Sequence, residues 1–224
     1  MHNRTVYGAL WIFVVLVFPA RVIFAEPENL DFFKQQLIRY HDSGEYAYEL
    51  EQVVGQATAY LTQRVTESRH PQPQKKLTIV FDIDETSLSN YHHLRTLGFG
   101  GRPQEMRDAI VQADAPAIPA TFNLYQHAKT LGVAVFFITG RGEELRTATA
   151  ANLKKTGYEN WDGLFCKPAD YRQPSVVPYK SGARKQIEEQ GYTVVLNMGD
   201  QYSDLAGGYA ERAFKLPNPY YYIP

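Results

Sequence analysis

The chain has 224 residues, of which 44% are hydrophobic, 21% are charged and 13% are aromatic. This composition is typical of soluble globular proteins and excludes an intrinsically disordered chain, which would carry more charge and fewer aromatic residues. The 23 basic and 24 acidic side chains leave a formal net charge of −1, which excludes binding to nucleic-acid polymers through bulk charge. A chain of this length can bury a full core, and we expect one domain.

The first 25 residues have the pattern of a secretory signal peptide. Arg4 supplies a positive charge, residues 6–20 form an apolar run, and the small residue Ala25 offers a cleavage site. As a helix this run would span only ~22 Å, less than the ~30 Å hydrocarbon core of a bilayer, so we expect no stable membrane anchor. We therefore predict a secreted or periplasmic mature chain, residues 26–224, with a net charge of −3.

The mature chain alternates between helical and strand patterns. Apolar residues from Tyr46 to Val65 recur at the spacing of one helix face. Continuous apolar runs predict buried strands at 77–81, 133–138 and 194–198, and a brief strand is predicted at 164–166. Helical patterns cover residues 120–131, 143–155 and 180–190. This alternation predicts an α/β fold, namely a three-layer α/β/α, Rossmann-like parallel sheet preceded by an N-terminal helical segment.

The interval between the first two strands is longer than one connecting helix requires. Asp82 and Thr139 are 57 positions apart, whereas a strand–helix–strand unit takes ~30 residues. The surplus, about residues 90–115, predicts a small helical cap, and the glycine-rich stretch 98–101 within it is interpreted as a turn. Three aromatic residues are candidates for stacking on a substrate, although core packing is the commoner use of such residues: Tyr91, Phe99 and Tyr125.

Three predicted strands end in polar residues, and the carboxyl ends of parallel strands form the ligand crevice of such sheets. Asp82 and Asp84 follow the first strand, where two carboxylates would repel each other unless a cation lay between them. Thr139 ends the second strand and suits either a helix cap or a phosphate site. Asp200 and Asp204 follow the strand at 194–198, in a pattern that suits either a hard cation or a helix cap.

Together with Lys180, these residues resemble the motif set of the haloacid-dehalogenase-like phosphohydrolases: D-x-D-x-T at a strand end, a strand-end Thr, a Lys and an acidic pair. The chain is more closely similar to the secreted acid phosphatases of the class B type, the group that also contains the plant vegetative storage proteins. The resemblance extends over about residues 29–224, and its typical runs are 80–90, 199–205 and 214–224.

The resemblance implies a two-step hydrolysis of a phosphate ester. Asp82 would be the nucleophile that takes the phosphoryl group, and Asp84 would be the general acid and later the base for water. Thr139, Gly140 and Lys180 would hold the phosphoryl oxygens. These residue types suit the chemistry, because phosphoryl transfer needs an in-line nucleophile and neutralised charge on three oxygens.

The resemblance also implies Mg²⁺ as the cofactor. Its ligands would be the side chains of Asp82 and Asp200 and the main-chain carbonyl of Asp84. Asp204 would support these ligands from the next layer of residues or pair with Lys180. A divalent cation and a lysine would reverse the local negative charge that otherwise repels a phosphate dianion.

The predicted function is therefore an exported, metal-dependent acid phosphatase acting on small phosphomonoesters, nucleotides among them. The alternatives are a phosphotransferase, in which an alcohol discharges Asp82, and a storage or binding protein with vestigial activity. Some storage proteins of this group lack the nucleophilic aspartate, so the presence of Asp82 favours catalysis. Arg141 either contacts the substrate or faces solvent, the lone Cys166 is expected as a half-buried strand residue, and assembly into a homo-oligomer is left open.

Overall fold

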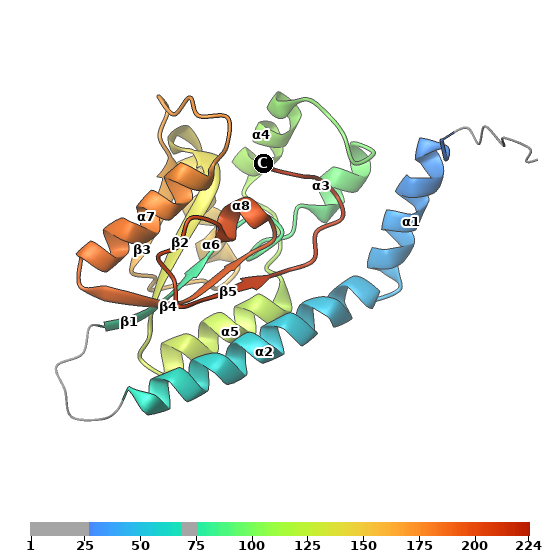
Figure 1. The fold of residues 1–224 in the computed structure, drawn as a ribbon. Helices are drawn as coiled ribbons and strands as arrows, with labels where there is room; N and C mark the ends of the chain where they lie inside the picture. Colours follow the sequence, from blue (N-terminus) through green and yellow to red (C-terminus); the bar gives the residue numbers. More distant parts are fainter. Residues whose placement is uncertain (1–26, 69–75) are drawn as a thin grey trace, which may run out of the picture.

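Figure 1 shows the computed structural model of the chain, which describes residues 27–68 and 76–224. The predicted signal peptide, residues 1–25, lies outside the described residues. At the centre of the fold is a five-stranded, fully parallel sheet with the strand order β3-β2-β1-β4-β5. The strands are β1 (Lys76–Phe81), β2 (Ala134–Gly142), β3 (Gly163–Lys167), β4 (Tyr192–Gly199) and β5 (Arg212–Lys215).

Helices cover both faces of this sheet. On one face α5 (Pro119–Thr130) packs on β2, and α2 (Glu45–Glu67) packs on α5, β4 and β5. On the other face α7 (Val177–Glu189) packs on β4 and β2. The predicted three-layer α/β/α architecture is confirmed. The remaining helices are α1 (Leu30–Asp42), α3 (Tyr91–Thr96), α4 (Pro103–Gln112), the 3₁₀ turn η1 (Glu143–Leu145), α6 (Arg146–Lys155) and α8 (Tyr202–Leu205).

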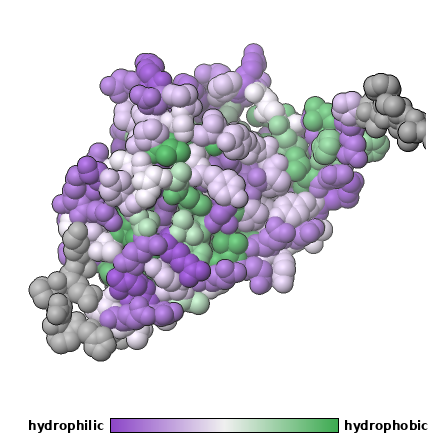
Figure 2. All heavy atoms as spheres, in the orientation of Figure 1, coloured by the Kyte–Doolittle hydropathy of each residue, from purple (hydrophilic) through white to green (hydrophobic). Residues whose placement is uncertain are grey.

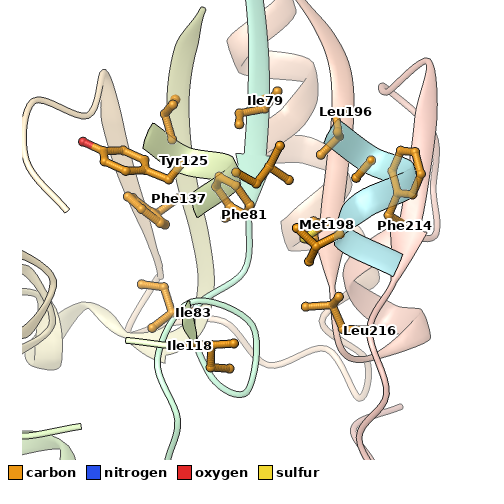
Figure 3. Packing of buried hydrophobic residues seen from close by; sticks show 14 of the residues in the cluster. Ile79, Phe81, Ile83, Ile118, Tyr125, Phe137, Leu196, Met198, Phe214 and Leu216 are labelled. Atoms are coloured by element: carbon orange, nitrogen blue, oxygen red, sulfur yellow. The ribbon is translucent and has the colours of Figure 1, made fainter. Parts of the chain in front are cut away.

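The alternation of side chains along the buried strands divides the apolar core between the two faces. Ile79 and Phe81 of β1 join the larger cluster, whereas Val80 between them joins the smaller one with Ile187 of α7. Figure 3 shows part of the larger cluster, with Phe81 of β1 close to Phe137 of β2. Continuous apolar runs therefore indicated correctly that these strands are buried on both faces.

The N-terminal helical segment predicted from the sequence is also confirmed. It consists of α1 and α2, and α2 buries all but one residue of the predicted stripe against the body of the protein: Tyr46, Leu50, Val54, Ala57, Leu61 and Val65. Val53, which the stripe also contains, is half-buried. In contrast, α1 has no buried residue and exposes Leu30, Phe32 and Phe33. Figure 2 shows apolar side chains gathered over α1 at the right of the molecule. Among the described residues, no helix is both long enough and apolar enough to cross a membrane.

Two helices, α3 and α4, lie in the interval between β1 and α5 where the surplus residues were found. The stretch 98–101 joins them as the expected turn, with positive φ at Gly98, Phe99 and Gly101. At Gly101, where φ is +105°, a Cβ atom would also lie 3.0 Å from the side chain of Leu97, so this position requires glycine.

The helix predicted over residues 143–155 begins later than expected. Strand β2 continues through Thr139 to Gly142, and a 3₁₀ turn occupies residues 143–145 before α6 begins at Arg146. Thr139 therefore lies within a strand, and the alternative that it caps this helix is wrong. Strand β5 was not predicted, because Ala213 and Phe214 are its only apolar residues.

Candidate active site

The loop after β1 carries the paired aspartates of the first motif. The main-chain N–H of Asp82 donates to the carbonyl of Met198 on β4, so the ladder of the sheet extends to this residue. Ile83 is fully buried in the larger apolar cluster. Its two neighbours, Asp82 and Asp84, both line the cavity.

Lys180 lies in the first turn of α7 and joins two of the predicted site residues. Its Nζ atom is 2.5 Å from Asp82 Oδ1 and 2.5 Å from Asp204 Oδ1, and all three side chains are buried. Burial acts to lower the pKa of the lysine, but the two carboxylates outweigh it and raise that pKa, so the ammonium stays charged. For Asp82, burial followed by the charge of Asp204 raises the pKa well above its usual value, although Lys180 opposes the shift.

Asp204 approaches this lysine because of the glycine that ends β4. A Cβ atom at position 199 would lie 2.4 Å from the Cβ of Asp204, closer than any side chain allows, so Gly199 is needed there. The second carboxylate oxygen of Asp204 accepts the N–H of Gln201 at 2.8 Å, which closes the turn into α8. Of the two roles expected for Asp204, the geometry shows the pairing with Lys180.

Asp200 is held by neutral hydrogen-bond donors. Its Oδ1 accepts the hydroxyl of Thr86 at 3.1 Å, and its Oδ2 accepts the side-chain amides of Gln201 at 2.8 Å and Asn218 at 2.6 Å. Burial and the nearby Asp204 raise the pKa of Asp200, and the two amides act in the opposite direction. The described residues contain no cationic side chain in a salt bridge with Asp200.

Arg141 is buried, so the alternative that it faces solvent is wrong. It lines the cavity, and its contact with the substrate stays a prediction. Its guanidinium is buried and binds Asp84, with distances of 2.7 Å from NH2 and 3.1 Å from Nε to Oδ1. Asn90 donates to the same oxygen at 2.8 Å. Burial acts to raise the pKa of Asp84, but Arg141 and Asn90 outweigh it and hold that pKa below its usual value.

The end of β2 supplies the predicted phosphate-binding pair. Gly140 lines the cavity together with Arg141, and a Cβ atom at position 140 would meet no neighbouring atom. Thr139 is fully buried and is not among the residues that line the cavity. Its hydroxyl accepts the main-chain N–H of Arg141 at 3.1 Å, which orders the turn that carries Gly140. Gly140 therefore lies at the cavity, whereas the side chain of Thr139 is buried in the protein and does not reach the cavity.

Glu85 is a buried carboxylate next to the site that the sequence-based interpretation did not single out. It has a φ of +50°, and its carboxylate accepts the main-chain N–H of Asn90 at 2.5 Å and the hydroxyl of Tyr221 at 2.7 Å. Burial, followed by the charges of Asp84 and Asp200, raises the pKa of Glu85 to about 8. These bonds tie the loop after β1 to the last residues of the chain.

Apart from Thr139, the predicted site residues line one cavity of about 770 Å³. Its charged floor is built at the carboxyl end of the sheet by Asp82, Asp84, Arg141, Lys180, Asp200 and Asp204. Apolar side chains from the segment with α3 and α4 form part of its wall: Leu94, Phe99, Met106 and Ile110. In Figure 1 this segment stands at the same end of the molecule as α8, the helix that contains Asp204. The cavity is thus polar at its base and partly apolar toward the cap segment.

Of the three aromatic residues considered for stacking, one lines this cavity. Phe99 does so, with its ring 5.7 Å from that of Tyr220. Tyr91 stacks on His41, and Tyr125 packs in the core against Tyr158. Tyr91 and Tyr125 therefore serve in packing.

The lone cysteine lies on a strand, as expected. Cys166 is part of β3 and is buried rather than half-buried. Burial raises the pKa of its thiol. The thiol is therefore a structural group of the sheet.

The acidic residues fit a hard divalent cation. One carboxylate oxygen from each of Asp82, Asp200 and Asp204 lies within 4.8 Å of the other two, and the group is buried. Carboxylate and carbonyl oxygens are the ligands that Mg²⁺ prefers. Lys180 pairs with two of these carboxylates, which leaves the charge of Asp200 for a cation. The main-chain carbonyl of Asp84, the third expected ligand, accepts no hydrogen bond from the described residues.

Besides Glu85, two more residues that organise the site were missed by the sequence-based interpretation. Arg184 is buried and donates to the main-chain carbonyls of Asp204, Ala206 and Gly208, so it holds the segment that carries Asp204. Its position one helical turn after Lys180 on α7 was an available signal, because residues four apart share a helix face. Asn218 lies within the run 214–224 that supported the resemblance, but no pattern linked it to Asp200.

Comparison with known proteins adds sequence relatives to this geometry. The chain is 43% identical over 154 residues to the stem 28 kDa glycoprotein of Glycine max, which covers 66% of this chain and 61% of that protein. It is 38% identical over 148 residues to acid phosphatase 1 of Solanum lycopersicum, covering 64% and 58%, and 36% identical over 149 residues to vegetative storage protein 1 of Arabidopsis thaliana, covering 65% and 55%. The matched region spans between 55% and 61% of these relatives.

Among solved structures, the fold is similar to that of the class C acid phosphatase from Bacillus anthracis, with a TM-score of 0.69 over 84% of this chain and 86% of that one. The two chains are 24% identical, so this similarity concerns the fold. The sequence profile of the HAD superfamily, subfamily IIIB (acid phosphatase), matches residues 25–224. The strand-end aspartates, the buried lysine and this match over nearly the whole chain lead to one conclusion: the chain belongs to the subfamily IIIB acid phosphatases of the HAD superfamily.

Proposed function

We propose that this chain hydrolyses small phosphomonoesters, with Asp82 as the nucleophile and with a divalent cation as cofactor. The observation that carries the proposal is the buried Asp82–Lys180 pair at the floor of the cavity, 2.5 Å apart, with Asp200 and Asp204 around it. A carboxylate next to fixed positive charge is suited to attack a phosphate ester, whose own negative charge would otherwise repel it.

In the first step, a carboxylate oxygen of Asp82 attacks phosphorus, and the bond between phosphorus and the ester oxygen breaks. The product is an aspartyl-phosphate and an alcohol, because Asp84 gives its proton to the departing oxygen. Lys180 and the main-chain N–H groups around Gly140 neutralise charge on the phosphoryl oxygens. Arg141 holds the Asp84 carboxyl in place through its buried guanidinium.

In the second step, Asp84 takes a proton from water, and the water oxygen attacks phosphorus. The bond between phosphorus and Asp82 breaks, which releases inorganic phosphate and restores the free carboxylate. Because Arg141 holds the pKa of Asp84 below its usual value, the ionised base form is the dominant form near neutral pH. The protonated form that the first step needs becomes more populated as the pH falls, which suits a phosphatase that works in acid.

We propose Mg²⁺ as the cation, held by the carboxylates of Asp82 and Asp200 and by the carbonyl of Asp84. Asp204 contributes negative charge to the same cluster while it binds Lys180. When bound, the ion neutralises phosphate charge during transfer. In its absence the burial of three neighbouring carboxylates is costly, which is consistent with the raised pKa values of Asp82 and Asp200.

A second candidate, storage with little activity, follows from the vegetative storage protein among the relatives. Against it, the chain has Asp82, Asp84, Lys180 and Asp200 together in one cavity. Storage alone would not require these residues, and their burial destabilises the fold. We therefore favour catalysis.

The test is a panel of phosphomonoesters assayed with the purified chain at acid and neutral pH, with Mg²⁺ and with excess chelator. We expect turnover with Mg²⁺, loss of turnover with chelator, and recovery when Mg²⁺ is added back. Full turnover in excess chelator would overturn the cation assignment. No turnover of any ester would favour the storage alternative. An alcohol added as acceptor distinguishes hydrolysis from transfer, because a phosphotransferase would form a new phosphate ester.

We also propose that the protein is exported, on the pattern of its first 25 residues. Expression of the whole chain in a secreting host, followed by N-terminal sequencing of the exported product, tests this proposal. We expect the product to begin at Glu26. Retention of the chain in the cell with an intact Met1 would contradict it.

A further inference from the structure

We infer that Asn218 is a positioning residue for the cation, because it holds Asp200 in the orientation that leaves one carboxylate direction free for a metal. The segment 217–224, which contains Asn218, is therefore part of the active site. The inference rests on the proposed function, since it concerns the cation of that reaction. The residues of the strand-end motifs alone do not supply this orientation of Asp200.

The hydrogen bonds of Asp200 carry the argument. A carboxylate offers about four lone-pair directions to donors. Three are used by Thr86, Gln201 and Asn218, and the shortest of these bonds is the 2.6 Å contact from Asn218 Nδ2 to Oδ2. About one direction remains, which suits a carboxylate that binds a cation through a single oxygen.

The nature of the donors matters as much as their number. All three are neutral, so none of them offsets the negative charge of the Asp200 carboxylate, whereas Asp82 and Asp204 share the charge of Lys180. A lysine or arginine in place of Asn218 would offset the charge that attracts the cation. An amide fixes the orientation of the carboxylate without offsetting that charge.

The segment is itself fixed to the site. The side chain of Gln201 accepts the N–H of Ile223 at 3.1 Å and donates to the carbonyl of Tyr221 at 3.3 Å. The other end of the Asn218 amide, Oδ1, accepts the N–H of Tyr220 at 2.8 Å. Tyr220, Tyr221 and Ile223 line the same cavity as the aspartates. Both polar atoms of the Asn218 amide are therefore bound: Oδ1 accepts from the N–H of Tyr220, and Nδ2 donates to Asp200.

Residues that orient a metal ligand through hydrogen bonds typically alter metal affinity by ~10- to 100-fold when they are replaced. We expect an effect of this size on Mg²⁺ binding from Asn218. The expected effect on the rate at saturating Mg²⁺ is smaller, because Asn218 contacts Asp200 and not the reacting atoms.

The experiment compares Mg²⁺ binding by the wild-type chain with that by Asn218→Ser and Asn218→Ala. Serine is too short to reach Asp200 but can still accept the N–H of Tyr220, whereas alanine loses both contacts. The control is Ser203→Ala, which removes a different anchor of the segment, the bond from the Ser203 hydroxyl to the carbonyl of Ile223. Affinity is measured by isothermal titration calorimetry and by the rise in melting temperature with Mg²⁺, and the Mg²⁺ dependence of turnover is recorded in parallel.

We expect Asn218→Ser and Asn218→Ala to weaken Mg²⁺ binding by at least about tenfold, and Ser203→Ala to bind within about twofold of wild type. Wild-type affinity in Asn218→Ser would overturn the inference, because the turn would then be the only function of Asn218. Equal weakening in Ser203→Ala would also overturn it, since general anchoring of the segment would explain the loss. If the wild-type chain binds no Mg²⁺, the proposed metal-dependent function fails instead, and the two failures are thereby distinguished.

Discussion

Residues 77–81 and residues 82–90 are consecutive in the chain and almost equally buried, yet they affect the protein in opposite ways. Ile79 and Phe81 are fully buried among apolar side chains, and each contributes to stability by leaving water. Asp82 and Glu85 are 5% and 1% exposed, and burial raises the pKa of both carboxyl groups, which means that burial opposes their charge. The apolar half, residues 77–81, stabilises the fold. The polar half, residues 82–90, destabilises it, because its carboxyl groups are buried away from water.

The polar half is not uniform. Asp84, two positions after Asp82, has the pKa shift of opposite sign, because Arg141 and Asn90 bind it directly. One carboxyl is therefore disfavoured as an anion in the cation-free protein, and its near neighbour is favoured as an anion. Such a separation is the usual basis on which two carboxyl groups take different roles in one reaction.

The largest expected effect comes from the polar half, in Asp82→Asn. The amide cannot form the aspartyl-phosphate, so we expect kcat/KM to fall by at least ~10³-fold, or ~4 kcal/mol of barrier. Without Mg²⁺ the melting temperature should not fall, because Lys180 keeps Asp204 while one buried carboxylate is removed. Steady-state assays and thermal melts in chelator measure both quantities, with the exposed Asp170→Asn as control. Retained activity would contradict the role of Asp82 as the nucleophile. A clearly lower melting temperature would contradict the statement that burial of its carboxylate destabilises the fold.

The next largest effect comes from the apolar half, in Ile79→Ala. We expect the free energy of unfolding to fall by about 3 kcal/mol, from lost burial and the cavity left behind. The kcat/KM of the folded fraction should stay within about threefold of wild type, because Ile79 faces the core and not the site. Urea unfolding followed by circular dichroism measures the loss, and Val111→Ala on the surface serves as control. A large loss of activity in folded Ile79→Ala would show that the two halves are not separable.

Asp84→Asn tests the division within the polar half. A general acid matters most when the leaving group needs a proton, so the variant should slow leaving-group release from an alkyl phosphate about 10²-fold more than from nitrophenyl phosphate, a difference of ~2.7 kcal/mol. Single-turnover rates of leaving-group release are the appropriate measurement, since steady-state turnover also includes hydrolysis of the phosphoenzyme. Equal losses for both esters would assign Asp84 a structural or metal-positioning role instead.

The smallest effect contrasts a surface carboxylate with the buried ones. Glu211 binds Arg64 at 2.7 Å, and this hydrogen bond and charge hold its pKa below the ordinary value of 4.5. A carboxyl group whose pKa is lower in the folded than in the unfolded state stabilises the folded state at pH values above its unfolded-state pKa. This stabilisation is lost as the pH falls through the folded-state pKa. We expect Glu211→Gln to cost about 0.5 kcal/mol at pH 7 and progressively less below pH 4.5, as measured by urea unfolding. A cost that grows toward low pH would contradict the assignment.

The sequence predicted the elements whose patterns are strong. The four longer apolar runs became β1 to β4. Strands β1, β2 and β4 are buried on both faces, which needs uninterrupted apolar residues, whereas β3 is a mostly half-buried strand at the edge of the sheet. Strand β5 (Arg212–Lys215) was not predicted because its sequence has no strand pattern. It is a strand because it pairs with β4. The convergence of Asp82 and Asp200 was also predictable, since parallel strands bring their carboxyl ends to one edge. Lys180 lies on α7 and was expected at the site only from the family resemblance. The partners of these residues were not predictable.

The sequence alone determined that Asp82 and Asp84 follow directly on the buried strand β1, because the apolar run that forms this strand and the residues after it are local features of the chain. Only the tertiary structure decided that Arg141 binds Asp84 across 57 positions, and that Asn218 reaches Asp200 from the last residues of the chain. Burial and partner distance set the charge of a carboxyl group, and both depend on segments that are far apart in sequence. The position of each aspartate was therefore local information, and its chemical state was not.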